Sequence, residues 1–192
     1  SPVYMTISEL FRHHSTLTVA DPIKLVCELH KSFVSMTGID ESLDHFYGWG
    51  QVLLADFDDL DKNMADADKV FANVRDIHEL DDVSYLSPEQ REAIKQFFST
   101  FSDDHNTLLR QRFLQLWSKM ADIYHDFNQR LAAQGLAYEG ALYRLRVESL
   151  GLRDNSLSTA KLKSLNPQPS TYLFVGFNLL QRVEQQLFLA LK

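Results

Sequence analysis

Apolar residues recur at intervals of three and four along most of the chain, and this spacing predicts helices that each bury one face. The clearest helix follows Asp21, an N-cap residue with proline in the next position, and ends before Gly38. The longest stripe runs from about 104 to 134 and stops at Gly135, so it predicts a central helix. The same spacing predicts helices over 43–57, 66–80, 87–101 and 138–150.

The two ends of the chain carry a different pattern. Val3 to Ile7 is β-branched and aromatic and precedes Ser8, a good N-cap, which predicts a short strand running into a helix. Thr171 to Val175 is fully apolar and predicts a buried strand, followed by a turn and a helix over 179–191. The polar stretch 155–169, which ends in Asn-Pro-Gln-Pro, is typical of a linker.

These patterns together predict a mainly α fold, a helical bundle-like domain with short β-strands near both ends. It has the form of a helical subdomain inserted in an α/β domain, most of whose sheet we expect to lie outside this sequence. We expect a strand-helix fragment over 1–20, the helical insertion over 21–165 and a second strand-helix fragment over 166–192, packed as one unit.

Composition narrows the class of protein. The chain has 192 residues and a net charge of −7, which is enough for one core and argues against coating duplex DNA through charge alone. Its one cysteine, Cys27, permits neither an internal disulfide nor a thiolate metal cage, and we expect a buried, inert thiol. No apolar run has membrane-spanning length and no signal-peptide pattern is present, so a cytoplasmic location without membrane contact is the simplest interpretation.

Motifs for catalysis or metal binding are not found. The acidic stretch from Asp56 to Asp68 fails as a calcium loop, because the twelfth position from Asp56 is Ala67, and we expect a solvated face whose aspartates cap helices. The seven histidines lack helical metal-site spacing, and there is neither a nucleophile elbow nor a phosphate-binding loop. The sequence therefore predicts no catalytic residue, no metal site and no cofactor.

Charge is distributed unevenly along the chain. Residues 56–82 hold ten acids and three bases, whereas residues 110–163 hold nine bases and five acids. Part of the molecule is thus suited to face phosphate, although solvated helix faces are the alternative interpretation for each basic residue. The densest basic set, beside Tyr143, supplies the candidate DNA contacts Arg144, Arg146, Arg153, Lys161 and Lys163.

Four segments carry a resemblance to a known family. They read TISELF (6–11), FYGWGQVLLADFDDLDK (46–62), GLAYEGALYR (135–144) and LFVGFNLLQRVEQQLF (173–188). Together they resemble the helicase-like region of AddB-type, PD-(D/E)XK nuclease family proteins of Bacteroidetes, which are related to UvrD-like superfamily-one helicases.

The resemblance implies roles for two of these segments. TISELF looks like the strand and helix of the first RecA-like lobe that lies beside single-stranded DNA, which makes Thr6 and Ser8 candidate DNA contacts. LFVGFN looks like a Walker B strand, but Gly176, Phe177 and Asn178 stand where active relatives have carboxylates. Without acids to hold magnesium and orient water, this turn is not expected to support ATP hydrolysis.

The resemblance therefore implies a non-catalytic helicase-like fragment of an AddB-like helicase-nuclease, structural and in contact with single-stranded DNA, that serves double-strand-break repair. Its implied partners are the remainder of the parent chain and an AddA-like helicase subunit; the parent, not this fragment, would carry enzymatic activity. A helical protein-protein interaction domain without a nucleic-acid role is the alternative hypothesis, and a small-molecule or metal enzyme is the third.

Overall fold

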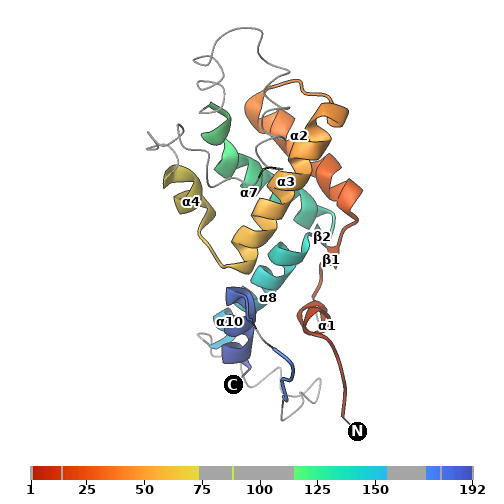
Figure 1. Cartoon of the computed structure of the whole chain (residues 1–192), viewed down its shortest axis with the longest axis vertical. Helices are drawn as coiled ribbons and strands as arrows, with labels where there is room; N and C mark the ends of the chain where they lie inside the picture. The colour runs from red at the N-terminus through yellow and green to blue at the C-terminus, as the bar shows by residue number, and fades with distance from the viewer. Residues whose placement is uncertain are drawn as a thin grey trace.

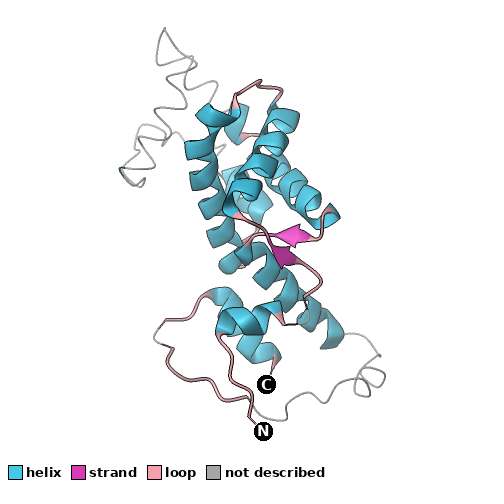
Figure 2. Ribbon diagram, turned by 90° about the vertical axis from the view of Figure 1, so that its right-hand side faces the viewer, coloured by secondary structure: helices cyan, strands magenta, loops and turns pink. Residues whose placement is uncertain are grey.

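The computed structural model describes residues 2–13, 15–73, 88, 115–154, 172–177 and 179–191. Helices account for most of them, which confirms the predicted mainly α fold (Figure 2). The elements, labelled in Figure 1, are α1 (Ile7–Arg12), β1 (Thr18–Val19), α2 (Pro22–Thr37), α3 (Leu43–Lys62), α4 (Ala67–Asn73), α7 (Met120–Ala133), β2 (Leu136–Ala137), α8 (Glu139–Asp154) and α10 (Arg182–Ala190).

Helix α2 has the two ends that the sequence predicts. The Asp21 side chain accepts hydrogen bonds from the backbone N–H groups of Ile23 and Lys24, which satisfies two donors that the first turn of a helix leaves free. Gly38 ends the helix in the left-handed conformation, with φ of 70°, where a side chain would be strained. The prediction for this helix is confirmed.

Helices α2, α3 and α7 pack together around one apolar core, with α4 beside α7 (Figure 1). Aromatic rings dominate it: Phe33 and Trp49 meet edge to face at 5.5 Å, and Phe57 meets Tyr124 at 5.2 Å. Helix α8 crosses α3 at the other end of the body, where α1 and α10 also pack on α8. The largest fully buried side chains of the described residues are Phe11, Phe33, Phe46, Phe57, Phe127, Leu29, Met120, Ile123, Leu131, Leu142, Leu187 and Val26.

A two-stranded parallel sheet joins distant parts of the chain, and the sequence pattern did not predict it. Thr18 pairs with Leu136 and Val19 with Ala137. This pairing fixes the connection between α1 and α2 against the connection between α7 and α8, so the α1 end of the chain is tied to the start of α8.

The strands predicted at the two ends are wrong in position. Residues 2–6 and 172–177 have no regular secondary structure, and neither segment pairs with a strand in the described residues. Val3, Leu173 and Val175 are 78%, 88% and 77% exposed, so the predicted burial at the second segment is wrong too. The reason is that β-branched residues favour an extended backbone, whereas a strand also needs a neighbour to complete its ladder.

The predicted central helix is interrupted. Of the predicted 104–134 stretch, the structure describes residues from 115 onward, and a turn at Ser118 and Lys119 separates helical residues 115–117 from α7. The Ser118 hydroxyl donates to the Gln115 carbonyl, a local bond of the kind that competes with a regular helix. The described members of the stripe (Leu116, Met120, Ile123, Phe127 and Leu131) are nevertheless all buried.

Other predictions meet the structure only in part. Gly135 follows α7 with φ of 69°, as the predicted stop requires. Leu109, Phe113, nearly all of the helix predicted over 87–101 and the predicted linker lie outside the described residues. For the helix predicted over 66–80, the structure describes the part up to residue 73, as α4.

Candidate functional site

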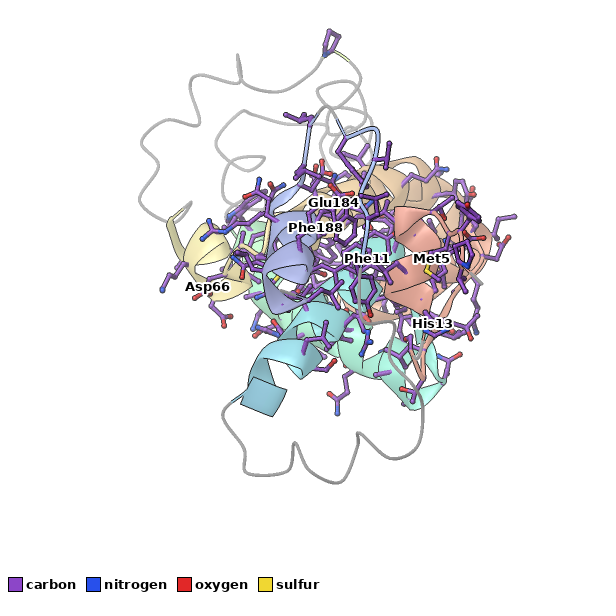
Figure 3. All side chains as sticks on the ribbon, turned by 90° about the horizontal axis from the view of Figure 1, so that it is seen from below. Met5, Phe11, His13, Asp66, Glu184 and Phe188 are labelled. Carbon is purple, nitrogen blue, oxygen red and sulfur yellow. The ribbon has the colours of Figure 1, made fainter. Side chains whose placement is uncertain are left out.

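The segments that carry the family resemblance meet around α8. TISELF forms the cap and body of α1, the second segment lies in α3, the third runs into the first turns of α8, and the fourth includes residues 173–177 and most of α10. Helices α1, α3 and α10 each pack against α8. Figure 3 views this end of the molecule and labels Phe11 of α1 and Phe188 of α10. We call this meeting place the α8 junction.

Gly140 lies directly against α3 in the junction. The Gly140 N–H donates to the Asp58 carboxylate at 2.6 Å, so a side chain of α3 caps the first turn of α8. A Cβ atom on residue 140 would lie 2.5 Å from the backbone oxygen of Asp58, which is closer than real side chains come. Glycine at this position therefore allows the two helix backbones to meet.

A lysine between two carboxylates fastens the same crossing. The Lys62 Nζ lies 2.7 Å from Asp58 and 3.0 Å from Glu139, and its side chain is largely covered. Burial works to lower the pKa of Lys62, but the hydrogen bonds that it donates to both carboxylates outweigh burial and raise it. The cation is thus held as a structural bridge between α3 and α8.

Tyr143 of α8 holds α1. Its ring stacks on Phe11 with 4.0 Å between centroids and 12° between planes, and its hydroxyl donates to Glu139 at 2.7 Å. The Ser8 hydroxyl lies 2.6 Å from the Tyr143 oxygen. Burial, together with the hydrogen bond to the Glu139 carboxylate, raises the pKa of Tyr143 to about 12, so this phenol stays protonated at neutral pH.

Asp61 lies inside the molecule, which corrects the expectation that the whole acidic stretch is a solvated face. It is 1% exposed and accepts hydrogen bonds from Tyr124 at 2.6 Å, from Tyr138, and from Arg144 Nη1 at 3.1 Å. Burial raises the pKa of Asp61, although these hydrogen bonds act in the other direction. The carboxylate joins α3, α7 and α8.

Asp66, in contrast, fits the predicted capping role. Its side chain accepts from the backbone N–H of Lys69 at 3.2 Å at the start of α4.

The burial of Asp61 could have been inferred, because it follows the core residue Phe57 by four positions and therefore shares its helix face. Sequence reasoning missed the other members of the junction as well: Asp58, Lys62, Tyr138 and Glu139.

The predicted DNA contacts are placed in several different environments. Thr6 caps α1, accepting from the Glu9 N–H while its own N–H donates to Glu9 at 2.6 Å. Ser8 is half-buried against Tyr143. Arg144 is engaged by Asp61, by the Ala65 carbonyl at 2.6 Å and by Glu148 at 2.9 Å. Arg146 is half-buried on α8, and the side chains of Arg153, Lys161 and Lys163 lie outside the described residues.

Most basic side chains in the described residues contact an acid. The carboxylates lie within 3.5 Å and partly neutralise the positive potential that a phosphate backbone would need. The paired residues are Arg12, Lys24, Lys31, Lys62, Lys69, Lys119, Arg130 and Arg144.

The turn that resembles a degenerate Walker B site lies beside α10. Gly176 has φ of 85°, as a tight turn requires, and the Phe177 ring lies 5.4 Å from Phe188. Phe174 also packs on Phe188, at 4.0 Å, whereas Asn178 lies outside the described residues. Glu184, the nearest acid along the described chain, accepts from the Gln181 N–H in the cap of α10.

Cys27 is half-buried rather than buried, because the apolar face of α2 is turned so that Ile23, one turn earlier, is 60% exposed. Within 2–13, 15–73, 115–154 and the described C-terminal residues, no group of three or more His, Cys, Asp or Glu is placed to hold a metal ion. None of the described helices is long and apolar enough to cross a membrane.

Comparison of the chain with family models, with curated proteins and with solved structures finds no match. The class of protein that the fold defines is therefore a mainly α domain built around the α8 junction. Any proposal about function therefore depends on the residues of the α8 junction and of the segments around it.

Proposed function

We propose that this chain is a non-catalytic, helicase-like part of an AddB-like helicase-nuclease, with a structural role and contact with single-stranded DNA in double-strand-break repair. The observation that carries the proposal is the α8 junction. Four segments scattered between residues 6 and 188 carry the resemblance, and the helices that contain them pack on one another. The proposal requires these segments to come together, because parts of one lobe pack on one another.

The segments without regular secondary structure near both ends support the same proposal. Residues 2–6 and 172–177 emerge at the end of the molecule where α1 and α10 lie (Figures 1 and 2). They present apolar side chains to solvent, including Val3, Tyr4, Leu173 and Val175. Exposed apolar groups gathered in this way are typical of surfaces that another layer covers. The β-sheet of a RecA-like lobe would supply that layer and would pair both segments.

In this proposal the module keeps the shape of a helicase lobe without its chemistry. The turn after residues 172–175 contains glycine, phenylalanine and asparagine, none of which holds magnesium as a carboxylate does. The sequence also contains no phosphate-binding loop. The parent protein, together with an AddA-like subunit, would perform the reactions on DNA.

The membership proposal is tested by the native gene. A phosphate-binding loop encoded before Ser1 and a PD-(D/E)XK signature encoded after Lys192 are the expected result. A natural stop codon directly after Lys192 would contradict the proposal, because the sheet and nuclease domain would then have no source in the same chain.

The DNA contact is tested by fluorescence anisotropy with a labelled single-stranded oligonucleotide and its duplex. Arg146→Glu is the test variant, because loss of Arg144 would leave buried Asp61 without its cation. Lys69→Glu is the control, since Lys69 is an exposed residue of α4. We expect weak binding that prefers the single strand, falls steeply with salt and is lowered by Arg146→Glu alone. If the affinity for the single strand changes neither with salt nor in Arg146→Glu, the proposed DNA contact is excluded.

A protein-protein interaction module is the second candidate function. It is favoured by the pairing of most described basic side chains with acids and by the apolar groups exposed on residues 2–6 and 172–177. A folded chain with no affinity for either oligonucleotide at low salt would favour this candidate over the first.

A further inference from the structure

Helix α1 is attached to the rest of the molecule as a small, local unit. It has six residues, and a helix of this length is not stable in water without tertiary contacts. Phe11 is its one buried side chain, while Ile7 and Leu10 are partly buried. The helix packs on α8. Its folding therefore depends on how well it is docked there.

The docking contact is concentrated on Tyr143. The aromatic half of the contact is the stack of Phe11 on the Tyr143 ring, and the polar half is the hydrogen bond between Ser8 and the Tyr143 hydroxyl. Arg12 adds a longer contact to Glu139, at 3.5 Å, with its side chain half exposed. One side chain of α8 thus holds both an early and a late turn of α1.

The residues on either side of α1 differ in how firmly they are held. Residues 2–6, before it, are exposed and have no backbone partner in the described chain other than the Thr6 cap. Residues 18–19, after it, are fixed by the parallel pairing with β2. Thr16 and Leu17 form a bend directly before β1, and the Ser15 hydroxyl stabilises it by donating to the Leu17 carbonyl and accepting from the Leu17 N–H. Movement of α1 away from α8 would therefore leave the β1–β2 pair in place.

We propose that α1 is a latch, which docks on α8 through Tyr143 and undocks as a unit together with residues 2–6 while the other described helices stay folded. Undocking uncovers the Tyr143 ring and Glu139, which Lys62 connects to α3. A partner that holds residues 2–6 would thereby act on the α8 junction. The proposal goes beyond the repair function and applies to the chain whatever its partner.

Hydrogen-deuterium exchange, read by mass spectrometry at neutral pH, tests the latch. In the unchanged chain, amides of α1 should exchange faster than those of α2 and α7, because the latch opens without global unfolding. Tyr143→Phe keeps the ring stack and removes the hydroxyl bonds to Ser8 and to Glu139. Only the bond to Ser8 reaches α1, so α1 exchange should rise about 2- to 10-fold, the effect of losing roughly one net hydrogen bond. Exchange in α2 and α7 should not change.

Two further variants complete the test. Ser8→Ala removes the same hydrogen bond from the α1 side and should reproduce the effect of Tyr143→Phe. Tyr47→Phe is the control, because the Tyr47 ring packs partly buried on α3 and its hydroxyl has no hydrogen bond to the described residues. Trypsin supplies a second readout: cleavage after Arg12 should accelerate in Tyr143→Phe and Ser8→Ala but not in Tyr47→Phe.

Two results would overturn the proposal. If α1 exchanges at the same rate as α2 and α7 in the unchanged chain, α1 opens only when the whole molecule unfolds. If Tyr143→Phe or Ser8→Ala raises exchange equally in α1, α2 and α7, the contact stabilises the fold as a whole and does not act as a latch.

Discussion

Two glycines of this chain predict opposite effects of the same substitution. Gly48 lies within α3, and a Cβ there would meet nothing within 4 Å. Gly140 lies in the first turn of α8, where a Cβ would come 2.5 Å from the Asp58 backbone oxygen and 2.9 Å from its carboxylate. We expect Gly48→Ala to stabilise the protein and Gly140→Ala to destabilise it.

The magnitudes follow from the two environments. In open space, alanine gains helix propensity worth about 0.5–1 kcal/mol relative to glycine. At Gly140 the obstacle is backbone, which cannot rotate away, so α8 must shift from α3 at a cost of roughly 1–3 kcal/mol for an overpacked site. The shift also stretches the hydrogen bond from Gly140 to Asp58, worth about another 1 kcal/mol. The helix propensity of alanine offsets about 0.5–1 kcal/mol of these costs, so the net expectation for Gly140→Ala is a loss of about 1–3 kcal/mol.

Urea unfolding followed by far-UV circular dichroism measures both effects. The urea midpoint should rise for Gly48→Ala and fall for Gly140→Ala. The free energy of unfolding should fall with urea at the same slope in both variants and in the unchanged protein, so that the midpoints report stability alone. If Gly140→Ala leaves the midpoint of the unchanged protein where it is, or raises it as Gly48→Ala does, then α3 and α8 do not approach as closely as the structure has them.

Three further outcomes are expected. Burial of Glu28 works to raise the pKa of its carboxyl, but hydrogen bonds from Lys24 and Lys31 lower this pKa from 4.5 to about 2. The two ion pairs therefore stabilise the folded protein fully above pH 4.5, and this stabilisation is lost as the pH falls toward 2. Because both lysines are partly exposed, Glu28→Gln should lower the free energy of unfolding by about 1–2 kcal/mol at pH 7, measured by urea unfolding, and by less at pH 3. An equal loss at both pH values would contradict the ion pairs. Phe127→Ala, which empties a fully buried site, should cost about 3–5 kcal/mol, and an unchanged midpoint would remove Phe127 from the core. Millimolar Mg-ATP should leave the melting temperature where sodium chloride of equal ionic strength leaves it, since the turn at Gly176 offers no carboxylate; a clear rise would mean that a nucleotide site has been overlooked.

The sequence was most informative where the local signals agree. For α2, the capping pair Asp21-Pro22, the apolar spacing and Gly38 all specify the same two ends, and the structure has them there. The start of α1 was misplaced although a signal was present. Thr6 and Glu9 have the spacing of a capping box, which identifies Thr6 and not Ser8 as the N-cap.

Features that depend on distant partners were not predictable from local patterns. The strands β1 and β2 have two residues each, too short for any alternation of polar and apolar side chains to show. The spacing from Phe57 indicates the helix face on which Asp61 lies, but the donors that satisfy its carboxylate, from Tyr124, Tyr138 and Arg144, belong to other elements and could not be read from local pattern. The two glycines within α3 also differ in a way that local pattern does not show, because only Gly50 lies against other groups, the Phe46 ring and Val26.

The pairing of Thr18 with Leu136 has a consequence for the order in which the chain folds. Strand β1 cannot pair until the ribosome has made β2, because Thr18 pairs with Leu136 and Val19 with Ala137. Contacts between residues so far apart in sequence close large loops and slow folding. During synthesis, α2 and α3 can associate early as neighbours, whereas α1 remains unanchored until β2 and α8 emerge. A nascent chain halted before residue 136 would therefore be expected to leave its first 20 residues open to proteases and chaperones.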